Sequence, residues 1–150
     1  MSGDQTMREY AAALPVPDFP TTAFTRPGPL ADSRVAIVTS AALHRSGDDA
    51  FSQGDTSYRM IPTEARDLVM GHWSPNFDRS GFVIDLNVVY PIDRLNELAA
   101  DGTIGSVASQ HISFAGNQPD DVATIRMDSG PAAAEELKAD GVDVVLLTPV

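Results

Sequence analysis

The sequence predicts an α/β domain with a mostly parallel sheet and flanking helices, of the Rossmann-like or flavodoxin-like kind. Two helix patterns, at residues 91–102 and 129–141, alternate with short apolar runs that are typical of strands. The last run, residues 144–147, is apolar throughout, as expected of a strand that helices bury on both faces. At 150 residues, the chain is long enough for one such domain.

Residues 1–33 are predicted to form an extended, proline-rich N-terminal arm, and residues 34–150 the α/β domain. Prolines at positions 15, 17, 20, 27 and 29 interrupt a helix and favour extended backbone. The first strand of the domain is predicted at residues 35–39, where the apolar run VAIVT begins the folded part of the chain.

The middle of the chain alternates loops with short elements. Residues 45–61 are rich in glycine and aspartate and are predicted to be loop. Residues 62–71 are predicted to form a short helix, because Thr63 suits its N-cap and Gly71 its end. Residues 82–90 are predicted to form a strand, although two polar residues interrupt its apolar pattern.

The C-terminal part carries the clearest helix signals. Residues 91–102 place their apolar side chains on one face and end in glycine. A strand is expected around residues 111–114. The helix at 129–141 has Pro131 in its first turn and ends in Gly141, and the final strand follows directly.

The composition is that of a globular protein, with 43% hydrophobic and 21% charged residues. The formal net charge of −11 repels phosphate backbones, and the ten lysine and arginine residues are scattered, so nucleic-acid binding is not expected. No apolar run approaches the roughly 18 residues of a membrane span, and no secretory signal is recognisable, so we expect a cytoplasmic location. The chain contains no cysteine, which removes thiolate chemistry from residues 1–150.

Three histidines lie in predicted connections or at strand edges, where imidazole can act as an acid, a base or a ligand. They are His44, His72 and His111. Each can equally be a hydrogen-bonded structural residue. A metal site built from His44, His72 and a carboxylate such as Asp78 is conceivable, but the spacing matches no compact metal motif, and we predict no metal.

Arg59 lies beside aromatic and apolar residues in GDTSYRMIP, residues 54–62. A guanidinium can bind a carboxylate at two points, as an amino-acid substrate would require; an ordinary salt bridge is the alternative. The chain contains neither a glycine-rich phosphate-binding motif nor a nucleophile elbow around a serine. These residues alone therefore predict an acidic α/β domain with a polar, histidine-bearing loop face, and no particular reaction.

Six sequence blocks in a fixed order resemble one family. They are VAIVTSAALH (35–44), GDTSYRMIP (54–62), GHWSPNFD (71–78), DLNVVYPIDRLNEL (85–98), DGTIGSVASQHISFAG (101–116) and LKADGVDVVLLTPV (137–150). Together they resemble the selenoprotein B family of glycine, sarcosine, betaine and D-proline reductases, with the D-proline reductase branch the nearest likeness. One departure is Trp-Ser-Pro at 73–75, where relatives favour small glycines, so the substrate stays open.

The resemblance implies an oxidoreductase subunit that cleaves a C–N bond of a small amino acid or amine with dithiol-derived electrons. In this family the last strand leads into a turn that carries selenocysteine, or cysteine in selenium-free members, and that residue would follow Val150. We therefore expect a chain that is incomplete at its C-terminus, cut short before its nucleophile by a UGA codon read as stop, and inactive alone. Processing of the chain end is the less favoured explanation.

The resemblance also implies partners: a subunit that bears a pyruvoyl group, and a thiol electron donor, together in a hetero-oligomer. It assigns catalytic roles to His72 and His111, which would transfer protons, and to Asp78, which would orient an imidazole. It assigns substrate binding to Arg59, His44, Asp85 and Asn87. Two alternatives stay open: a nucleophile-free binding or assembly subunit of the same fold, and a metal-dependent or racemase-like enzyme built on His44, His72 and Asp78.

Overall fold

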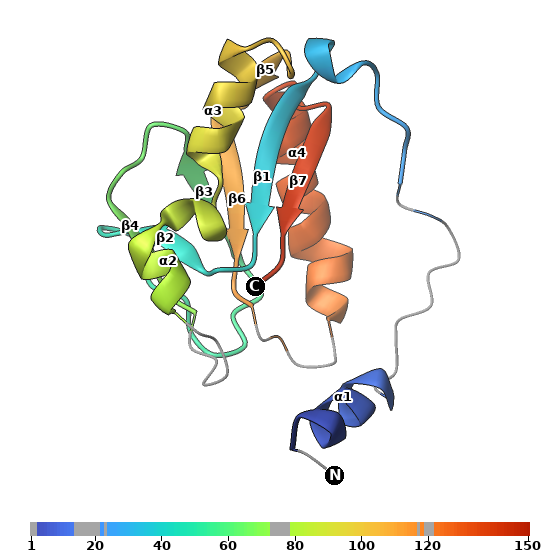
Figure 1. The fold of residues 1–150 in the computed structure, drawn as a ribbon, viewed down its shortest axis with the longest axis vertical. Helices are drawn as coiled ribbons and strands as arrows, with labels where there is room; N and C mark the ends of the chain where they lie inside the picture. The colour runs from blue at the N-terminus through green and yellow to red at the C-terminus, as the bar shows by residue number, and fades with distance from the viewer. Residues whose placement is uncertain (1–2, 14–21, 23, 73–78, 117, 119–121) are drawn as a thin grey trace.

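The computed structural model describes residues 3–13, 22, 24–72, 79–116, 118 and 122–150. Figure 1 shows the arrangement of its helices and strands. In chain order these are α1 (Gly3–Ala13), η1 (Leu30–Asp32), β1 (Arg34–Thr39), β2 (Leu43–Arg45), β3 (Tyr58–Pro62), β4 (Leu68–Met70), α2 (Ser80–Ile84), η2 (Leu86–Val88), α3 (Ile92–Ala100), β5 (Ser106–Val107), β6 (Gln110–Phe114), η3 (Ile125–Ser129), α4 (Gly130–Ala139) and β7 (Val144–Thr148).

The main sheet is built around β1. On one side, β1 pairs in parallel with β5 at its start and with β6 at its end; on the other side it pairs in parallel with β7 along nearly its whole length. β3 joins the far side of β6 in antiparallel orientation. The predicted α/β class with a mostly parallel sheet is therefore confirmed, with one antiparallel pair in this sheet. The Rossmann-like or flavodoxin-like topology stays a prediction.

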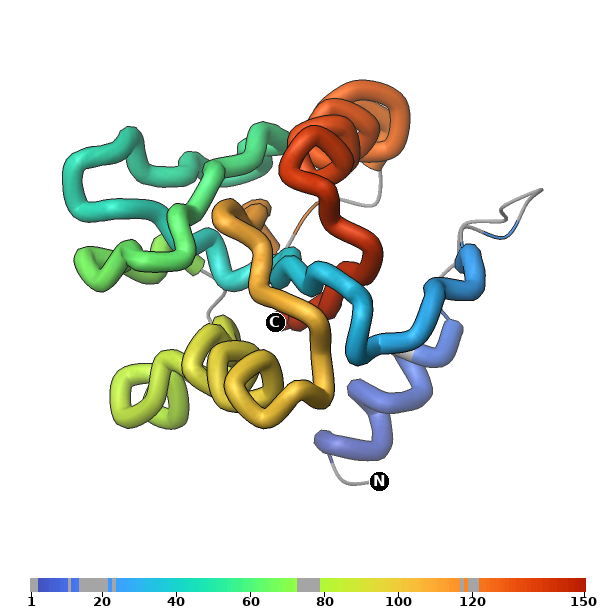
Figure 2. Tube along the Cα trace, turned by 90° about the horizontal axis from the view of Figure 1, so that it is seen from above, coloured from blue at the N-terminus to red at the C-terminus, as the bar shows by residue number. Residues whose placement is uncertain are grey.

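Two helices cover opposite faces of this sheet, as the views in Figures 1 and 2 show. α3 packs on the face that carries Ile37, where Tyr90 and Leu95 are buried in the same cluster. α4 packs on the other face, where Ala36 and Leu137 share a second cluster. The alternation of side chains along β1 supplies apolar residues to both faces. The strand predicted at residues 35–39 is confirmed as β1, and it is buried on both faces.

The predicted helices at 91–102 and 129–141 are confirmed as α3 and α4. A wider π-helical turn, η3, leads into α4. Pro131 explains this turn, because proline lacks an N–H and its ring clashes with the carbonyl four residues earlier in a regular α-helix. Gly130 permits it, since a Cβ at that position would overlap the carbonyl oxygen of Ile125.

The helix predicted at residues 62–71 is wrong. The Thr63 hydroxyl does not cap a helix; it donates to the carbonyl of Ala108 and so ties the turn after β3 to the main sheet. The chain then forms β4, which pairs antiparallel with β2. Pairing with a distant strand has overridden a local capping pattern.

The strand predicted at residues 82–90 is also wrong, because this stretch forms α2 and η2. The two polar residues that interrupt the apolar pattern are responsible. The Asp85 carboxylate accepts hydrogen bonds from the backbone N–H and the side-chain amide of Asn87, both at 2.9 Å, and so begins η2. Local bonds of this kind compete with a strand ladder.

The expectation that residues 144–147 are buried on both faces is wrong as well. They form β7, but Leu147 is 69% exposed, and Val145 and Leu146 are each 39% exposed. Within the described part of the chain, β1 is the strand that pairs with β7, so the other edge of β7 is open.

The stretch interpreted as an extended arm contains α1, which Figure 1 shows apart from the sheet. Asp4 and Arg8 lie four residues apart in α1 and form an exposed ion pair at 3.0 Å. Of the helices described, none combines the length and the apolar character needed to cross a bilayer.

Candidate functional site

The carboxyl ends of β1, β6 and β7 meet at one edge of the sheet, which is where open α/β sheets bind ligands. A pocket of about 210 Å³ opens at this edge. Residues 38–40, Phe114 and residues 147–149 line it. The candidate site is therefore built from the last residues of three neighbouring strands and the first residues that follow them.

Ser40 connects β1 to the chain beyond β7. Its backbone N–H donates to the carbonyl of Thr148 at 3.3 Å, which extends the ladder by one residue. Its hydroxyl accepts from the N–H of Val150 at 2.8 Å and lies 3.4 Å from the Val150 carbonyl oxygen. The backbone at Val150 is therefore held at the carboxyl edge by a side chain of the central strand.

Two threonines at the same edge have structural hydroxyls. Thr39 and Thr148 both donate to the carbonyl oxygen of Val89, at 3.0 and 2.9 Å. This oxygen lies between η2 and α3, so the bonds fix that connection over the ends of β1 and β7. Because both hydroxyls are engaged in this way, neither is placed as a nucleophile.

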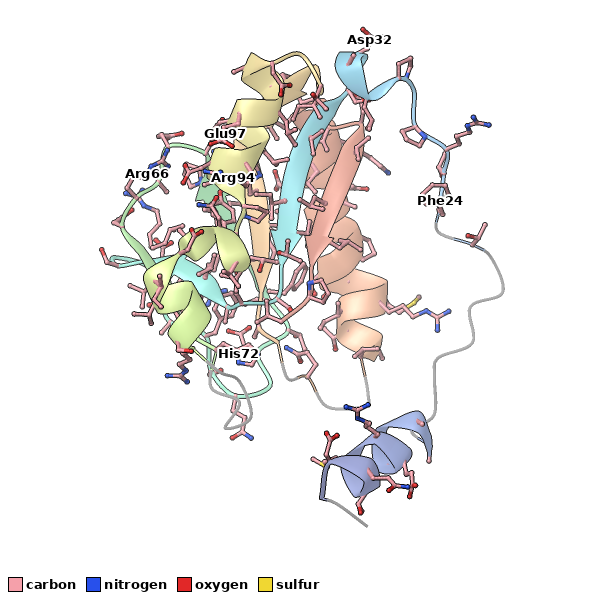
Figure 3. The ribbon with its side chains drawn as sticks, in the orientation of Figure 1. Phe24, Asp32, Arg66, His72, Arg94 and Glu97 are labelled. Carbon is pink, nitrogen blue, oxygen red and sulfur yellow. The ribbon has the colours of Figure 1, made fainter. Side chains whose placement is uncertain are left out.

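His72 follows β4 and is only 4% exposed. Burial lowers its pKa, the charge of Arg79 lowers it further, and a hydrogen bond to the backbone of Val150 opposes the shift. Gly116 lies directly against the ring, since a Cβ there would be 2.6 Å from Nε2. The Arg79 guanidinium donates to the His72 carbonyl. His72, labelled in Figure 3, is thus a mainly neutral imidazole beside the chain at Val150.

His44 is buried close to His72 in the fold, but its contacts are local. Its Nδ1 donates to the carbonyl of Ala42 at 3.1 Å, and its ring meets the edge of Phe51 at a centroid distance of 6.1 Å. Gly71 leaves room for it, because a Cβ at Gly71 would be 3.3 Å from the His44 ring. Substrate binding by His44 stays a prediction.

His111 is a residue of β6 and is completely buried. Its Nδ1 accepts from the backbone N–H of Ile37 at 2.9 Å, which requires the proton to be on Nε2. Nε2 then donates to the Thr63 hydroxyl at 3.1 Å. Burial lowers the pKa of His111 to about 4. These are the contacts of a neutral structural histidine, and proton transfer by His111 stays a prediction.

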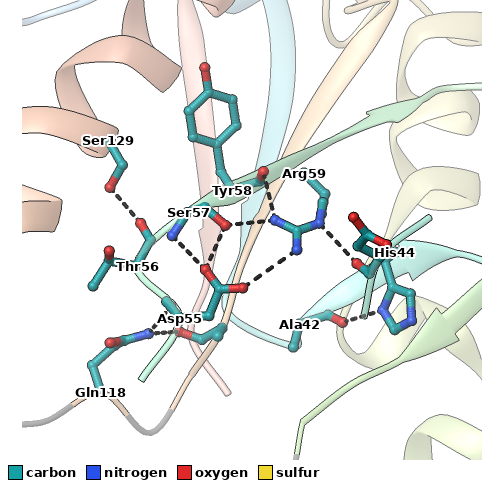
Figure 4. Close-up of polar contacts among 11 residues, drawn as sticks. Ala42, His44, Asp55, Thr56, Ser57, Tyr58, Arg59, Gln118 and Ser129 are labelled. Carbon is teal, nitrogen blue, oxygen red and sulfur yellow. Dashed lines mark hydrogen bonds and ion pairs between the residues drawn. The ribbon is translucent and has the colours of Figure 1, made fainter. Parts of the chain in front are cut away.

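Arg59 is engaged by its own loop, as Figure 4 shows. Its Nε donates to the carbonyl of Asp49 at 3.1 Å, and its guanidinium carbon lies 4.3 Å from the centre of the Phe51 ring. Its Nη1 donates to the Ser57 hydroxyl and to the Tyr58 carbonyl, at 2.7 and 3.2 Å. With the ion pair described next, four of its five N–H groups have partners within this loop.

The ion pair of this loop joins Arg59 Nη2 to Asp55 at 3.4 Å. Burial raises the pKa of Asp55, but hydrogen bonds from Ser57 and the Arg59 charge outweigh burial, and the pKa lies below its ordinary value. The loop is anchored to the carboxyl edge, since Ser129 donates to the Thr56 carbonyl at 2.6 Å and Gln118 to the Asp55 carbonyl at 2.8 Å. Binding of a substrate carboxylate by Arg59 stays a prediction.

The remaining predicted site residues do not join His72. Asp85 and Asn87 form the exposed cap of η2, and Asn87 also accepts from the N–H of Asp93 at 3.1 Å at the start of α3. Asp78 lies outside the described residues. Within the described residues, no three His, Asp or Glu side chains are grouped so as to hold a metal ion.

The sequence interpretation missed Ser40, Gly116 and Arg79. Ser40 directly follows β1, and Gly116 follows the end of β6 by two residues. A positional rule could have identified both, because residues just past the carboxyl ends of parallel strands form the ligand edge. Arg79 gave no such signal, since only the fold brings its guanidinium to the backbone of His72.

The chain is similar in sequence to subunits of three reductases. The chain is 38% identical over 122 residues to D-proline reductase subunit gamma of Acetoanaerobium sticklandii. The matched region covers 79% of this chain and 49% of the relative. It is 30% identical over 145 residues to sarcosine reductase complex component B subunit beta of Peptoclostridium acidaminophilum, covering 87% of this chain and 32% of the relative.

A third relative is glycine reductase complex component B subunit gamma of Carboxydothermus hydrogenoformans, 25% identical over 153 residues, covering 93% of this chain and 33% of the relative. The chain thus spans about half or less of the length of these curated relatives. No solved structure matches it with significance. The family described as glycine/sarcosine/betaine reductase selenoprotein B matches residues 5–150. The chain belongs to this selenoprotein B family of reductase subunits.

Proposed function

We propose that this chain is part of a reductase subunit that cleaves the C–N bond of a small amino acid or amine with electrons from a dithiol. Family membership and the names of the relatives, which are D-proline, sarcosine and glycine reductase subunits, support the reaction class. The observation that carries the proposal is the position of Val150. Its backbone is bound by Ser40 and lies beside His72 at the carboxyl edge of the sheet, where open α/β sheets bind ligands.

The proposal includes a selenocysteine or cysteine directly after Val150, in a reading frame that continues past codon 150. A residue there would project from the carboxyl edge, next to the neutral imidazole of His72. Selenolates and thiolates are strong nucleophiles, and a neutral imidazole can accept the proton that generates them. A reducing compartment such as the cytoplasm, which we propose as the location, keeps such a group active.

The nucleophile's electron pair forms a bond to the substrate carbon while the C–N bond breaks, and the amine leaves with a proton that His72 can donate. A thiol then attacks the nucleophile atom, and the carbon departs with the bonding electron pair and takes up a proton. This attack leaves a selenium–sulfur bond, or a disulfide where the nucleophile is cysteine, and the dithiol donor reduces it. A pyruvoyl group on a partner subunit would hold the substrate amine, and no residue of this chain is assigned to bind it.

The first test is the nucleotide sequence after codon 150. We expect TGA, or a cysteine codon, followed by an in-frame coding region. The complete frame, expressed with its partner subunits and dithiothreitol, is then assayed for amine or ring-opened product from D-proline, sarcosine, glycine and betaine. A TAA or TAG codon with no frame behind it would remove the nucleophile and leave the assembly subunit as the better proposal.

One observation favours that second candidate, a nucleophile-free assembly subunit. The outer residues of β7 are apolar and exposed, and Leu147 is 69% exposed. Apolar edges of this kind are usually covered by another element or another chain. The two candidates differ in whether the complete complex loses activity when the residue after Val150 is replaced by serine.

A further inference from the structure

We propose that Ser40 and Gly116 are positioning residues that hold the backbone at Val150 against His72, and so fix where the group after Val150 lies. The inference rests on the proposed function for its chemical consequence, while its structural part can be tested independently. The two residues come from the ends of neighbouring strands, β1 and β6.

The role of Ser40 follows from a gap in the β1–β7 ladder. The ladder's last backbone bond runs from the Ser40 N–H to the Thr148 carbonyl. In a parallel ladder with this register, the next donor towards β1 is the Val150 N–H, and its regular acceptor would be the Ser40 carbonyl. The Ser40 hydroxyl instead accepts from the Val150 N–H at 2.8 Å. The Ser40 hydroxyl thus takes the place of a backbone acceptor, and it keeps Val150 aligned with the end of β1.

The role of Gly116 follows from its close approach to two groups. A Cβ at this position would lie 2.6 Å from His72 Nε2, 2.9 Å from His72 Cδ2 and 2.7 Å from the Ser40 carbonyl oxygen. Contacts under about 3 Å do not occur between real non-bonded heavy atoms of this kind. The Ser40 carbonyl is a backbone group directly after the central strand and yields less easily than a side chain, so we expect a side chain at Gly116 to displace the His72 ring.

The strand ends that carry both residues are fixed to each other. Ala42 donates through its N–H to the Phe114 carbonyl at 2.9 Å, and Ala41 and Ala115 form a β-bridge just past the parallel pairing. Ala41 and Ala115 are also almost completely buried. Ser40 and Gly116 therefore lie just beyond two strand ends that are bonded to each other, and groups supported in this way are positioned more accurately than groups on a free loop.

The kinetic test uses the complete reading frame in its complex. Ser40→Ala and Gly116→Ala are expected to lower kcat by about tenfold or more with little change in KM, because a small misplacement of reacting groups is costly. Ser40→Thr keeps the hydroxyl and is expected to retain most of kcat. Gly105→Ala is the matched control: its Cβ would lie 2.7 Å from Asp32 backbone, at the opposite edge of the sheet. It is expected to lose thermal stability and keep kcat.

The structural test uses the complete chain in its complex and does not depend on activity. Ser40→Ala is expected to raise the amide exchange rate of Val150 by about tenfold, as for loss of one protecting bond, whereas Ser40→Thr leaves it near wild type. Gly116→Ala is expected to abolish the nuclear Overhauser contacts between the His72 ring and Val150, while Gly105→Ala preserves them.

The outcomes separate the two proposals. Unchanged Val150 exchange in Ser40→Ala, or unchanged His72 contacts in Gly116→Ala, would overturn the positioning role whatever the activity. If the wild-type complex reduces none of the amines, the proposed function is refuted. If the variants nevertheless change Val150 exchange and the His72 contacts, the positioning of Val150 is established. An equal loss of kcat in Gly116→Ala and Gly105→Ala would show that the loss comes from impaired folding. It would overturn the proposal that Gly116 positions the group after Val150 for the reaction.

Discussion

The backbone N–H of Ile37 in β1 donates to Nδ1 of His111 in β6 at 2.9 Å, and this bond requires a buried imidazole whose Nδ1 carries no proton. The ring also meets Tyr90 edge-on at 5.4 Å. Burial penalises a charge on this ring, which is why the pKa lies far below its ordinary value. A proton on Nδ1 would also break the bond to Ile37.

Stability is accordingly expected to fall in mild acid. The pKa of His111 is about 4 in the folded chain against 6.5 for a free histidine, so the unfolded state takes up a proton first as the pH drops. The contribution is complete above pH 6.5 and is lost between there and pH 4, by about 3 kcal/mol. Urea unfolding at several pH values measures this slope. His111→Gln should flatten it, and an equally steep slope in that variant would assign the effect to other groups.

Asp140 is expected to contribute more stability than an exposed carboxylate. It accepts from Arg34 Nη2 at 2.7 Å and from the Ser109 N–H and hydroxyl at 2.7 and 2.8 Å, so it joins α4 to the starts of β1 and β6. Asp140→Asn should cost about 1–3 kcal/mol in chemical unfolding. Glu97→Gln is the control, since its 2.9 Å ion pair with Arg94 is exposed and should cost under about 0.5 kcal/mol. Equal losses would contradict the prediction.

Arg59→Ala is expected to destabilise the loop at residues 46–57 rather than only weaken substrate binding. The guanidinium is engaged by Asp49, Ser57 and Asp55, and these bonds are lost together. We expect a loss of about 2 kcal/mol, measured by chemical unfolding, with Arg8→Ala on exposed α1 as control. A strong rise in KM for the complete complex at unchanged stability would instead support the predicted carboxylate-binding role.

The π-helical turn gives a prediction about coupled substitutions. Gly130→Ala alone should destabilise by about 1–3 kcal/mol, because the new Cβ meets the Ile125 carbonyl. In a Pro131→Ala background the turn can tighten to a regular α-helix, so the same substitution should cost less. A double-mutant cycle by thermal unfolding measures the difference. Strict additivity would show that Pro131 does not cause the turn.

His72→Gln in the complete complex is expected to lower kcat by roughly 100-fold, the usual size of a general acid–base contribution, with a smaller effect on KM. The reason is its position beside Val150 as a buried and mainly neutral imidazole. His44→Gln is the matched comparison, since His44 is also buried but bonds to Ala42. An equal loss of kcat in both variants would point to folding rather than proton transfer.

The sequence predicted those parts of the fold that local patterns determine. β1, β6, α3 and α4 have clear periodicity or termination signals, and each lies where expected. Residues 62–71 and 82–90 were wrongly predicted, because a distant strand decided the first and an aspartate–asparagine cap the second. The solvent exposure of β7 could not be predicted either, because an apolar run does not indicate which elements lie beside the strand.

The candidate site was predictable only in part. The sequence identified His72, which the fold places beside Val150 at the carboxyl edge, and also His111, which the fold buries within β6. Residue type alone cannot separate these two, because the difference lies in what each ring nitrogen contacts. Ser40 and Gly116 carry little chemical signal in the sequence, and their proximity to His72 and Val150 arises from pairing between distant strands.

The bonds from Thr39 and Thr148 to the Val89 carbonyl mean that one oxygen joins three stretches of chain that lie 50 and 59 residues apart in sequence. A carbonyl oxygen has two lone pairs, and both are occupied here. The connection before α3 is therefore bonded through one atom to the ends of both β1 and β7, and the second of these bonds lies two residues before Val150.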